Sequence, residues 1–181
     1  LEIWFDALHR PNLMGSVHQA RIDRVFSSQN RAMARLKNGE VISLRLRKND
    51  RRLVVVGAIL PVTIIAAPRH GKPWQAVVGA RLVTDNMVLL VGQVNQTDSI
   101  QLSSRIKGNH RHYLTERLMA ETRPVLPPGY GIILRRNGVN LSDFGDAVTA
   151  LLKMWQAGTQ TLGEEELGLI FDAGDLLTRA R

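Results

Sequence analysis

Two hydrophobic periodicities predict an α+β protein, with a small β-barrel in the first half and an α/β element after it. Apolar residues alternate with polar ones along several short segments before residue 91, which is the period of half-buried strands. After residue 110 the apolar residues recur at helical spacing. Short strands separated by Gly and Pro are typical of a barrel. The 181 residues fit one domain or two small ones.

The strand pattern is clearest at residues 41–47. Ile42, Leu44 and Leu46 alternate there with polar or basic residues, so one face is apolar and the other basic. Residues 20–26 and 32–37 repeat the pattern, and Asn38-Gly39 between two such segments is the signal of a tight hairpin. Further strands are expected at residues 53–56, 62–67, 75–83 and 88–91.

The second half predicts helices around one buried strand. A short helix is expected at residues 110–122, followed by breaks at Pro124 and at 127–129, and then a strand at 131–134. Apolar residues from Phe144 to Trp155 fall at helical spacing, with Ser142 as the expected N-cap. A last helix is expected to open at residues 164–166 and to end near Arg181.

Charge and composition narrow the function classes. The chain carries a net charge of +8 and has 44% hydrophobic residues, which excludes a disordered chain and favours an anionic partner. Residues 1–60 and 61–137 each have a net charge of +6, whereas 138–181 have −4. No apolar run reaches the length of a transmembrane helix, and no membrane partner is expected. The absence of cysteine excludes disulfides and fits a cytoplasmic protein.

The basic strand faces are the main candidate site. A peripheral membrane protein would more often carry its charge on an amphipathic helix, so positive strands indicate nucleic acid. The alternative is a solvated outer face. The sequence offers no aromatic residue on this face for base stacking, so binding would depend on phosphates and on salt. The five residues expected to hold RNA here are Arg31, Arg35, Lys37, Arg45 and Arg47.

A second basic group surrounds Gly108. Arg105 and Lys107 are expected to contact RNA, with His110, Arg111 and His112 nearby. Two histidines one residue apart suggest a metal site, but no third ligand follows at a recognisable spacing, so a phosphate contact or a solvated loop is favoured.

The acidic residues predict no catalytic centre. Asp172 and Asp175 imitate a paired-acid metal site, but residues three apart on an exposed helix face are commonly just solvated. Asp143 and Asp146 stand near a helix start, where the helix dipole favours acids. The sequence shows no Ser-His-Asp arrangement and no phosphate-cradling glycine loop.

Five motifs, in order, resemble the ribonuclease E/G family. Residues 102–108 (LSSRIKG) are similar to the family's ISRRIEG, and 129–139 (GYGIILRRNGV) to GMGLIVRTAGVG. Residues 88–91 (VLLV) resemble part of YLVLMP, 152–155 (LKMW) resemble LKHW, and 20–25 (ARIDRV) resemble GKITRI. The resemblance implies an OB-type barrel at residues 15–84, with 1–14 and 85–181 forming part of a ribonuclease H-like domain.

The resemblance also implies site residues. In that family the OB domain binds single-stranded RNA and a neighbouring pocket recognises a 5′-monophosphate. Arg135 matches the phosphate-binding arginine, Arg136 replaces a threonine, and Val91 matches an apolar residue of that pocket. The two OB aromatics fall on Met33 and Ser43, and Lys72 matches a basic residue at the barrel edge.

The family's Mg²⁺-dependent cleavage uses two aspartate motifs that this sequence does not contain. The chain is therefore expected to be the RNA-binding and 5′-sensing portion of such an endoribonuclease, with no cofactor of its own. Two alternatives remain: a stand-alone, non-catalytic RNA-binding adaptor or chaperone, and a structural protein whose basic face docks an acidic partner. The sequence leaves the oligomeric state open.

Overall fold

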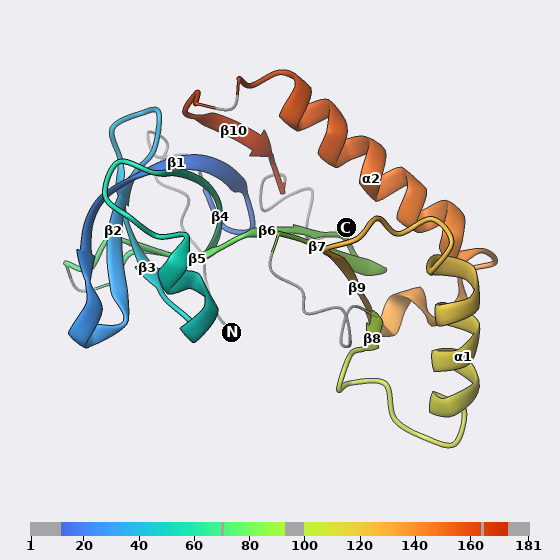
Figure 1. Ribbon diagram of the computed structural model, residues 1–181. Coiled ribbons are helices and arrows are strands. Elements are labelled where there is room, and N and C mark those ends of the chain that lie inside the picture. Colours follow the sequence, from blue (N-terminus) through green and yellow to red (C-terminus); the bar gives the residue numbers. More distant parts are fainter. Residues whose placement is uncertain (1–11, 70, 93–99, 164, 174–181) are drawn as a thin grey trace.

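The computed structural model describes residues 12–69, 71–92, 100–163 and 165–173. These residues form a closed five-stranded β-barrel and, beside it, a four-stranded sheet covered by two α-helices (Figure 1). The predicted mixed α+β class is thus confirmed. No helix among the described residues has the length and apolar character needed to cross a membrane.

The barrel closes through strand pairs in the order β1-β2-β3-β5-β4, with β4 also pairing with β1. All neighbours are antiparallel except β3 and β5, which are parallel. This arrangement is compatible with an OB-type barrel. Its strands are β1 (Val17–Phe26), β2 (Arg31–Arg35), β3 (Val41–Arg45), β4 (Ile59–Ala66) and β5 (Trp74–Val78).

The predicted alternation places the apolar side chains inside the barrel. Ala32 and Ala34 of β2 and Ile42 and Leu44 of β3 are completely buried. The predicted hairpin joins these strands, and Gly39 takes the positive φ (82°) that its turn requires. The side chains that alternate with these buried residues along β2 and β3 therefore point outward.

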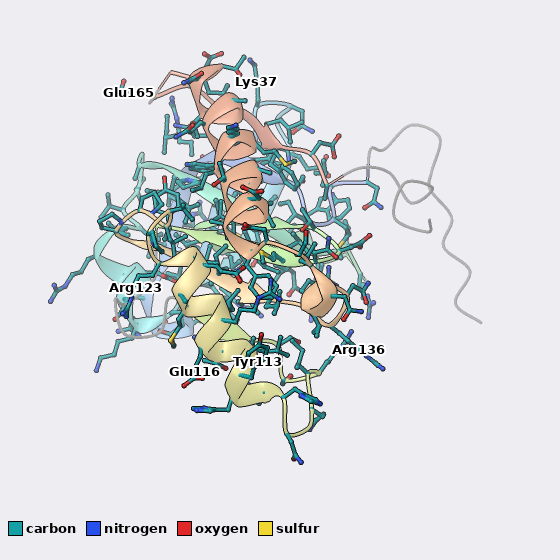
Figure 2. The ribbon with its side chains drawn as sticks, turned by 90° about the vertical axis from the view of Figure 1, so that its right-hand side faces the viewer. Lys37, Tyr113, Glu116, Arg123, Arg136 and Glu165 are labelled. Atoms are coloured by element: carbon teal, nitrogen blue, oxygen red, sulfur yellow. The ribbon has the colours of Figure 1, made fainter. Side chains whose placement is uncertain are left out.

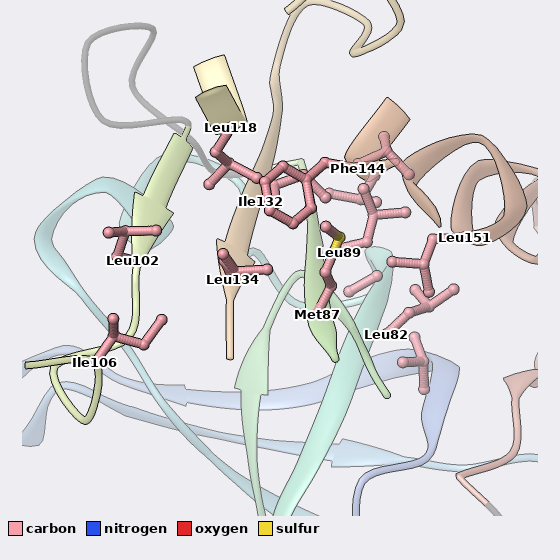
Figure 3. Packing of buried hydrophobic residues seen from close by; sticks show 14 of the residues in the cluster. Leu82, Met87, Leu89, Leu102, Ile106, Leu118, Ile132, Leu134, Phe144 and Leu151 are labelled. Carbon is pink, nitrogen blue, oxygen red and sulfur yellow. The ribbon is translucent and has the colours of Figure 1, made fainter. Parts of the chain in front are cut away.

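The second unit is a mixed sheet with the order β6-β7-β9-β8, in which β8 and β9 are parallel. Helices α1 (Arg111–Thr122) and α2 (Phe144–Gln160) pack on one face of it. Phe144 is fully buried there among Leu118, Leu89 and Ile132 (Figure 3). The strands are β6 (Ala80–Val83), β7 (Met87–Val91), β8 (Ile100–Leu102) and β9 (Tyr130–Leu134).

A short strand, β10 (Gly168–Phe171), returns from α2 to the barrel and pairs with the start of β1 (Figure 1). Ile170 and Val17 both belong to the core of the second unit. Helix α2 approaches β10 so closely that a Cβ at Gly158 would lie 2.1 Å from the Ile170 carbonyl oxygen. The two units thus share one strand and part of one core.

Three predicted elements were wrong. Residues 53–56 follow the 3₁₀ helix η2 (Lys48–Arg52) as irregular chain with only Val54 buried, so β-branched composition alone did not make a strand. The range of the predicted last helix, from 164–166 to Arg181, contains β10 instead, because pairing with β1 overrides the helical preference of the acidic start; residues 174–181 lie outside the described part of the chain. The N-cap of α2 is Asp143, whose Oδ1 accepts a hydrogen bond from the Asp146 N–H at 2.8 Å, and not Ser142.

The predicted domain boundaries also need correction. The predicted strand 75–83 divides at Gly79 (φ 91°), after which β6 pairs with β7 of the second sheet. The barrel therefore ends before residue 80 and not at 84. Leu13 packs into the barrel core, so residues just before 15 belong to the barrel as well. Residues 1–11 lie outside the described part of the chain.

Candidate nucleic-acid interface

The outer face of β2 and β3 carries side chains in facing pairs. The register sets Arg31 opposite Arg45, and Met33 opposite Ser43. Arg35 lies opposite Val41 at the hairpin end. Directly opposed side chains have Cβ atoms about 5 Å apart, so the Arg31–Arg45 pair concentrates two positive charges at the end of the strands away from the hairpin.

Two of the five predicted RNA-binding cations of the barrel have acidic partners. The guanidinium of Arg35 lies 2.8 Å from a carboxylate oxygen of Asp23, and Lys37 Nζ lies 3.2 Å from Glu166 Oε1. Arg31, Arg45 and Arg47 are exposed, and no carboxylate of the described residues lies within 4.0 Å of their guanidinium nitrogens. These three arginines are therefore the strongest anion-binding candidates on the barrel.

Further exposed cations adjoin these arginines and were missed in the sequence. A β-bulge between Ile22 and Arg24 shifts the register, so that Arg24 faces Met33 while Arg21 faces Arg35. The 3₁₀ helix η2 exposes Lys48, Arg51 and Arg52 beside the end of β3. Strand alternation identifies Arg21, but neither the bulge nor the 3₁₀ helix has a sequence period that would reveal the others.

Asp50 lies beneath the exposed basic side chains of η2 and stabilises the turn that carries them. It is 2% exposed, and its Oδ2 accepts a hydrogen bond from the backbone N–H of Arg47 at 2.6 Å. Arg51 donates to the side-chain oxygen of Asn30, in the turn that precedes β2. The acid thus holds the η2 turn, and the turn presents the basic side chains.

A groove of about 550 Å³ runs beside the hairpin end of β2 and β3. Met33, Val41, Pro68 and Pro73 give it apolar walls, and Arg69, Lys72 and Glu40 add charged groups. Two positions carried over from the family resemblance, Met33 and Lys72, therefore meet in one groove; Ser43 lies opposite Met33. The apolar contacts come from methionine, valine and proline, so this groove has no aromatic ring among its described lining residues.

A second basic cluster lies in the second unit, in a pocket of about 460 Å³. Because β8 and β9 run parallel, Ser103 and Arg135 follow their carboxyl ends at the same edge of the sheet. Asp85, in the turn between β6 and β7, contributes one negative charge. The lining residues are Asp85, Ser103, Arg105, Arg135, Arg136 and Asn137.

Arg135 is held by hydrogen bonds, whereas Arg136 is exposed. The Arg135 guanidinium donates from Nη1 to the Thr84 carbonyl oxygen at 2.5 Å, and its backbone N–H donates to the Asn86 carbonyl oxygen at 2.8 Å. Gly138 lies against the same turn, because a Cβ there would be 2.4 Å from the Asn86 oxygen. Arg136 is exposed, at the opposite end of the molecule from Lys37 in Figure 2.

Val91, which the resemblance groups with Arg135, is not among the described residues that line this pocket. It pairs with Tyr130 at one end of the β7–β9 ladder, whereas Met87 pairs with Leu134, next to Arg135, at the other. The four-residue offset corresponds to about 13 Å along the strand. Val91 lines a separate cavity of about 40 Å³ together with Arg47 and Arg81. Burial lowers the pKa of Arg81, and the neighbouring charge of Arg47 lowers it further.

The basic residues around Gly108 have different roles in the structure. Arg105 lines the pocket, whereas Lys107 is exposed and is not among its lining residues. Arg111 has a structural role, because its Nη1 donates to the carbonyl oxygens of Ser103 and Ile106 at 3.1 and 2.9 Å. It therefore shapes the loop that carries Arg105.

The histidines and acids of this part gather into no metal site. His110 is exposed, and His112 Nε2 lies 3.2 Å from Glu116 Oε1 on the surface of α1. Asp172 is exposed after β10, and Asp175 lies outside the described residues. Among the described residues no group of three His, Asp or Glu side chains is placed to hold a metal ion.

Comparisons with known proteins add no family assignment. Neither a scan against protein-family models nor a search of curated proteins finds a match to this chain.

Proposed function

We propose that this protein binds single-stranded RNA across the outer face of its barrel. The observation that carries the proposal is the facing pair Arg31 and Arg45, continued by Arg47, with no carboxylate of the described residues within 4.0 Å of the three guanidinium groups. OB-type barrels bind oligonucleotides on the face of strands 2 and 3, next to the loops joining strands 1–2 and 4–5. Here those loops contribute Asn30 and the groove residues Arg69 and Lys72.

The pocket of the second unit is proposed to hold the 5′-monophosphate of the RNA. Arg105, Arg135 and Arg136 supply three positive charges against the single charge of Asp85. Guanidinium–phosphate pairs are strong, charge-assisted hydrogen bonds, and a terminal phosphate carries more negative charge than one within the chain. The bond of Arg135 to Thr84 orients the guanidinium before the ligand arrives.

These two sites correspond to the RNA-binding and 5′-sensing parts of a ribonuclease E/G-type endoribonuclease. In that assignment the barrel is the OB domain, and the second sheet with its helices is the start of a ribonuclease H-like domain. Mg²⁺-dependent cleavage would need aspartate motifs that match no position in this sequence. The activity proposed for the chain itself is therefore binding.

Fluorescence anisotropy with a short single-stranded RNA labelled at its 3′ end tests both sites. The labelled RNA carries either a 5′-monophosphate or a 5′-hydroxyl, and each is titrated at two salt concentrations. Tighter binding of the monophosphate supports both sites. Equal binding that weakens steeply with salt supports the barrel site alone, and no binding at low salt refutes the proposal.

A generic RNA-binding adaptor is the second candidate function. The substitution of arginine for threonine at position 136 favours it, because arginine keeps the attraction for phosphate and removes the hydroxyl contact. Equal affinity for both RNA ends, together with an unchanged affinity after Arg135→Ala, would support this candidate over 5′ sensing.

A further inference from the structure

Phe26, the last residue of β1, lies on the basic outer face of the barrel. The register places it directly opposite Arg31, which in turn faces Arg45. Paired residues of neighbouring strands point to the same side of the sheet. The next pair along, Val25 and Ala32, points inward, and Ala32 is completely buried. One row across three strands therefore reads phenylalanine, arginine, arginine.

The ring of Phe26 is only partly buried and does not serve either hydrophobic core. The partly buried apolar side chains packed against the barrel core include Val25 but not Phe26. It is likewise absent from the core of the second unit. Among the described residues the guanidinium that covers an aromatic ring is that of Arg117, over Phe144. Among the described residues, Phe26 is therefore a half-buried aromatic side chain on the outer face that belongs to neither core.

We propose that Phe26 is a stacking platform for one unpaired base, with Arg31 and Arg45 binding the phosphates beside it. An aromatic ring accepts any base by stacking, whereas flanking guanidinium groups bind the backbone. Facing side chains are about 5 Å apart at Cβ, so the guanidinium groups reach the phosphates of a nucleotide stacked on the ring. This inference rests on the proposed RNA-binding function and extends it.

A stacking platform restricts the ligand to single-stranded nucleic acid, whereas positive charge alone would bind any polyanion. A base within a duplex is already stacked and paired, so its face is not available to the ring. A single strand exposes that face at every nucleotide. The site therefore selects single-stranded over double-stranded nucleic acid with little preference for base identity, and the strand must extend to the end of the β1–β2 hairpin.

The experiment compares two ligands with equal numbers of phosphates: a ten-nucleotide single-stranded RNA and the same backbone with abasic positions. Phe26→Ala is expected to weaken binding of the base-containing RNA by about 5- to 100-fold. It should leave the affinity for the abasic backbone within twofold. Phe26→Trp should retain the affinity for RNA. Tyr113→Ala, which removes an exposed aromatic from α1, is the matched control and should change neither affinity.

The outcomes separate this inference from the proposed function. If the wild type binds neither ligand, RNA binding itself is refuted. If it binds both ligands equally and Phe26→Ala changes nothing, RNA binding stands and the stacking platform is refuted. If Phe26→Ala weakens both ligands equally, or if Phe26→Trp weakens the RNA as much as alanine does, Phe26 supports the shape of the hairpin and stacks on no base. Thermal melts of each variant verify that the barrel remains folded.

Discussion

Arg31 and Arg45 face each other across β2 and β3, so two like charges occupy directly opposed positions of one antiparallel pair. Such pairs destabilise a sheet, and no carboxylate of the described residues within 4.0 Å relieves this one. An anion bound between the two arginines would offset this repulsion, so the pair is consistent with an anion-binding site. This unfavourable contact supports the proposal that the barrel face binds an anion.

Arg45→Gln is expected to raise stability and lower RNA affinity at the same time. Removing one like charge relieves the repulsion, so the free energy of unfolding should increase by about 0.2–1 kcal/mol in denaturant titrations. The slope of log affinity against log salt should fall by about one unit, because one phosphate contact is lost. Arg123→Gln, at the exposed end of α1, is the control with the same change in net charge. An equal loss of affinity in the control would contradict a specific barrel site.

Arg135→Ala is expected to abolish any preference for a 5′-monophosphate over a 5′-hydroxyl end and to leave the affinity for the hydroxyl RNA nearly unchanged. The physical reason is that Arg135 is the guanidinium fixed in the pocket by Thr84. Anisotropy with the two 3′-labelled RNAs measures both affinities. An equal loss on both RNAs would show that Arg135 contacts the backbone generally.

Gly138→Ala should damage the pocket without affecting the barrel. The added Cβ would lie 2.4 Å from the Asn86 carbonyl oxygen, which also accepts the Arg135 N–H, so the turn between β6 and β7 must shift. Overpacking of this kind costs about 1–3 kcal/mol of stability. A lower melting temperature should accompany a lost preference for the monophosphate, with the affinity for the hydroxyl RNA unchanged. Gly39→Asn is the control variant. A Cβ at Gly39 meets nothing within 4 Å, so this substitution tests the positive φ of that turn without any steric clash.

The stability of the fold should fall with decreasing pH because of His18. Ser16 Oγ donates to the Leu13 carbonyl oxygen, so it accepts from His18 Nε2 at 2.8 Å, and burial lowers the pKa of His18 while the charge of Asp172 opposes the shift. The unfolded chain thus takes up the proton more readily. The stabilisation is fully present above about pH 6.5 and is lost as pH falls toward the lower folded-state pKa. His18→Gln, which keeps an N–H donor, should flatten the pH dependence of the denaturation midpoint between pH 7 and 5.

The sequence predicted the faces of the barrel strands better than the relations between them. The alternation of Ile42 and Leu44 was sufficient to place Arg45 outside, and the Asn38-Gly39 turn was sufficient to pair β2 with β3. Partners distant along the chain could not be inferred. Glu166 follows Lys37 by 129 residues, and only the return of β10 to the barrel brings the two together.

Local irregularities explain most of the remaining errors. The bulge in β1 moved Arg24 onto the outer face, and the positive φ of Gly79 ended the barrel five residues before the predicted boundary. Alternation from Ala20 and Ile22 placed Phe26 on the inner face, and the same bulge turned it outward. The grouping of Arg105 with Arg135 depended on the parallel pairing of β8 and β9, which no local pattern predicts.

Strand β1 joins β2, β4 and β10, and its first residue, Val17, is buried in the core of the helical unit. Opening the barrel therefore exposes part of that core, which makes the two units one cooperative block. Ligand binding stabilises every amide whose exchange with solvent requires that block to open. An RNA bound only at the barrel face should accordingly slow hydrogen exchange in α2, far from any nucleotide, by the same free energy as in β2 and β3.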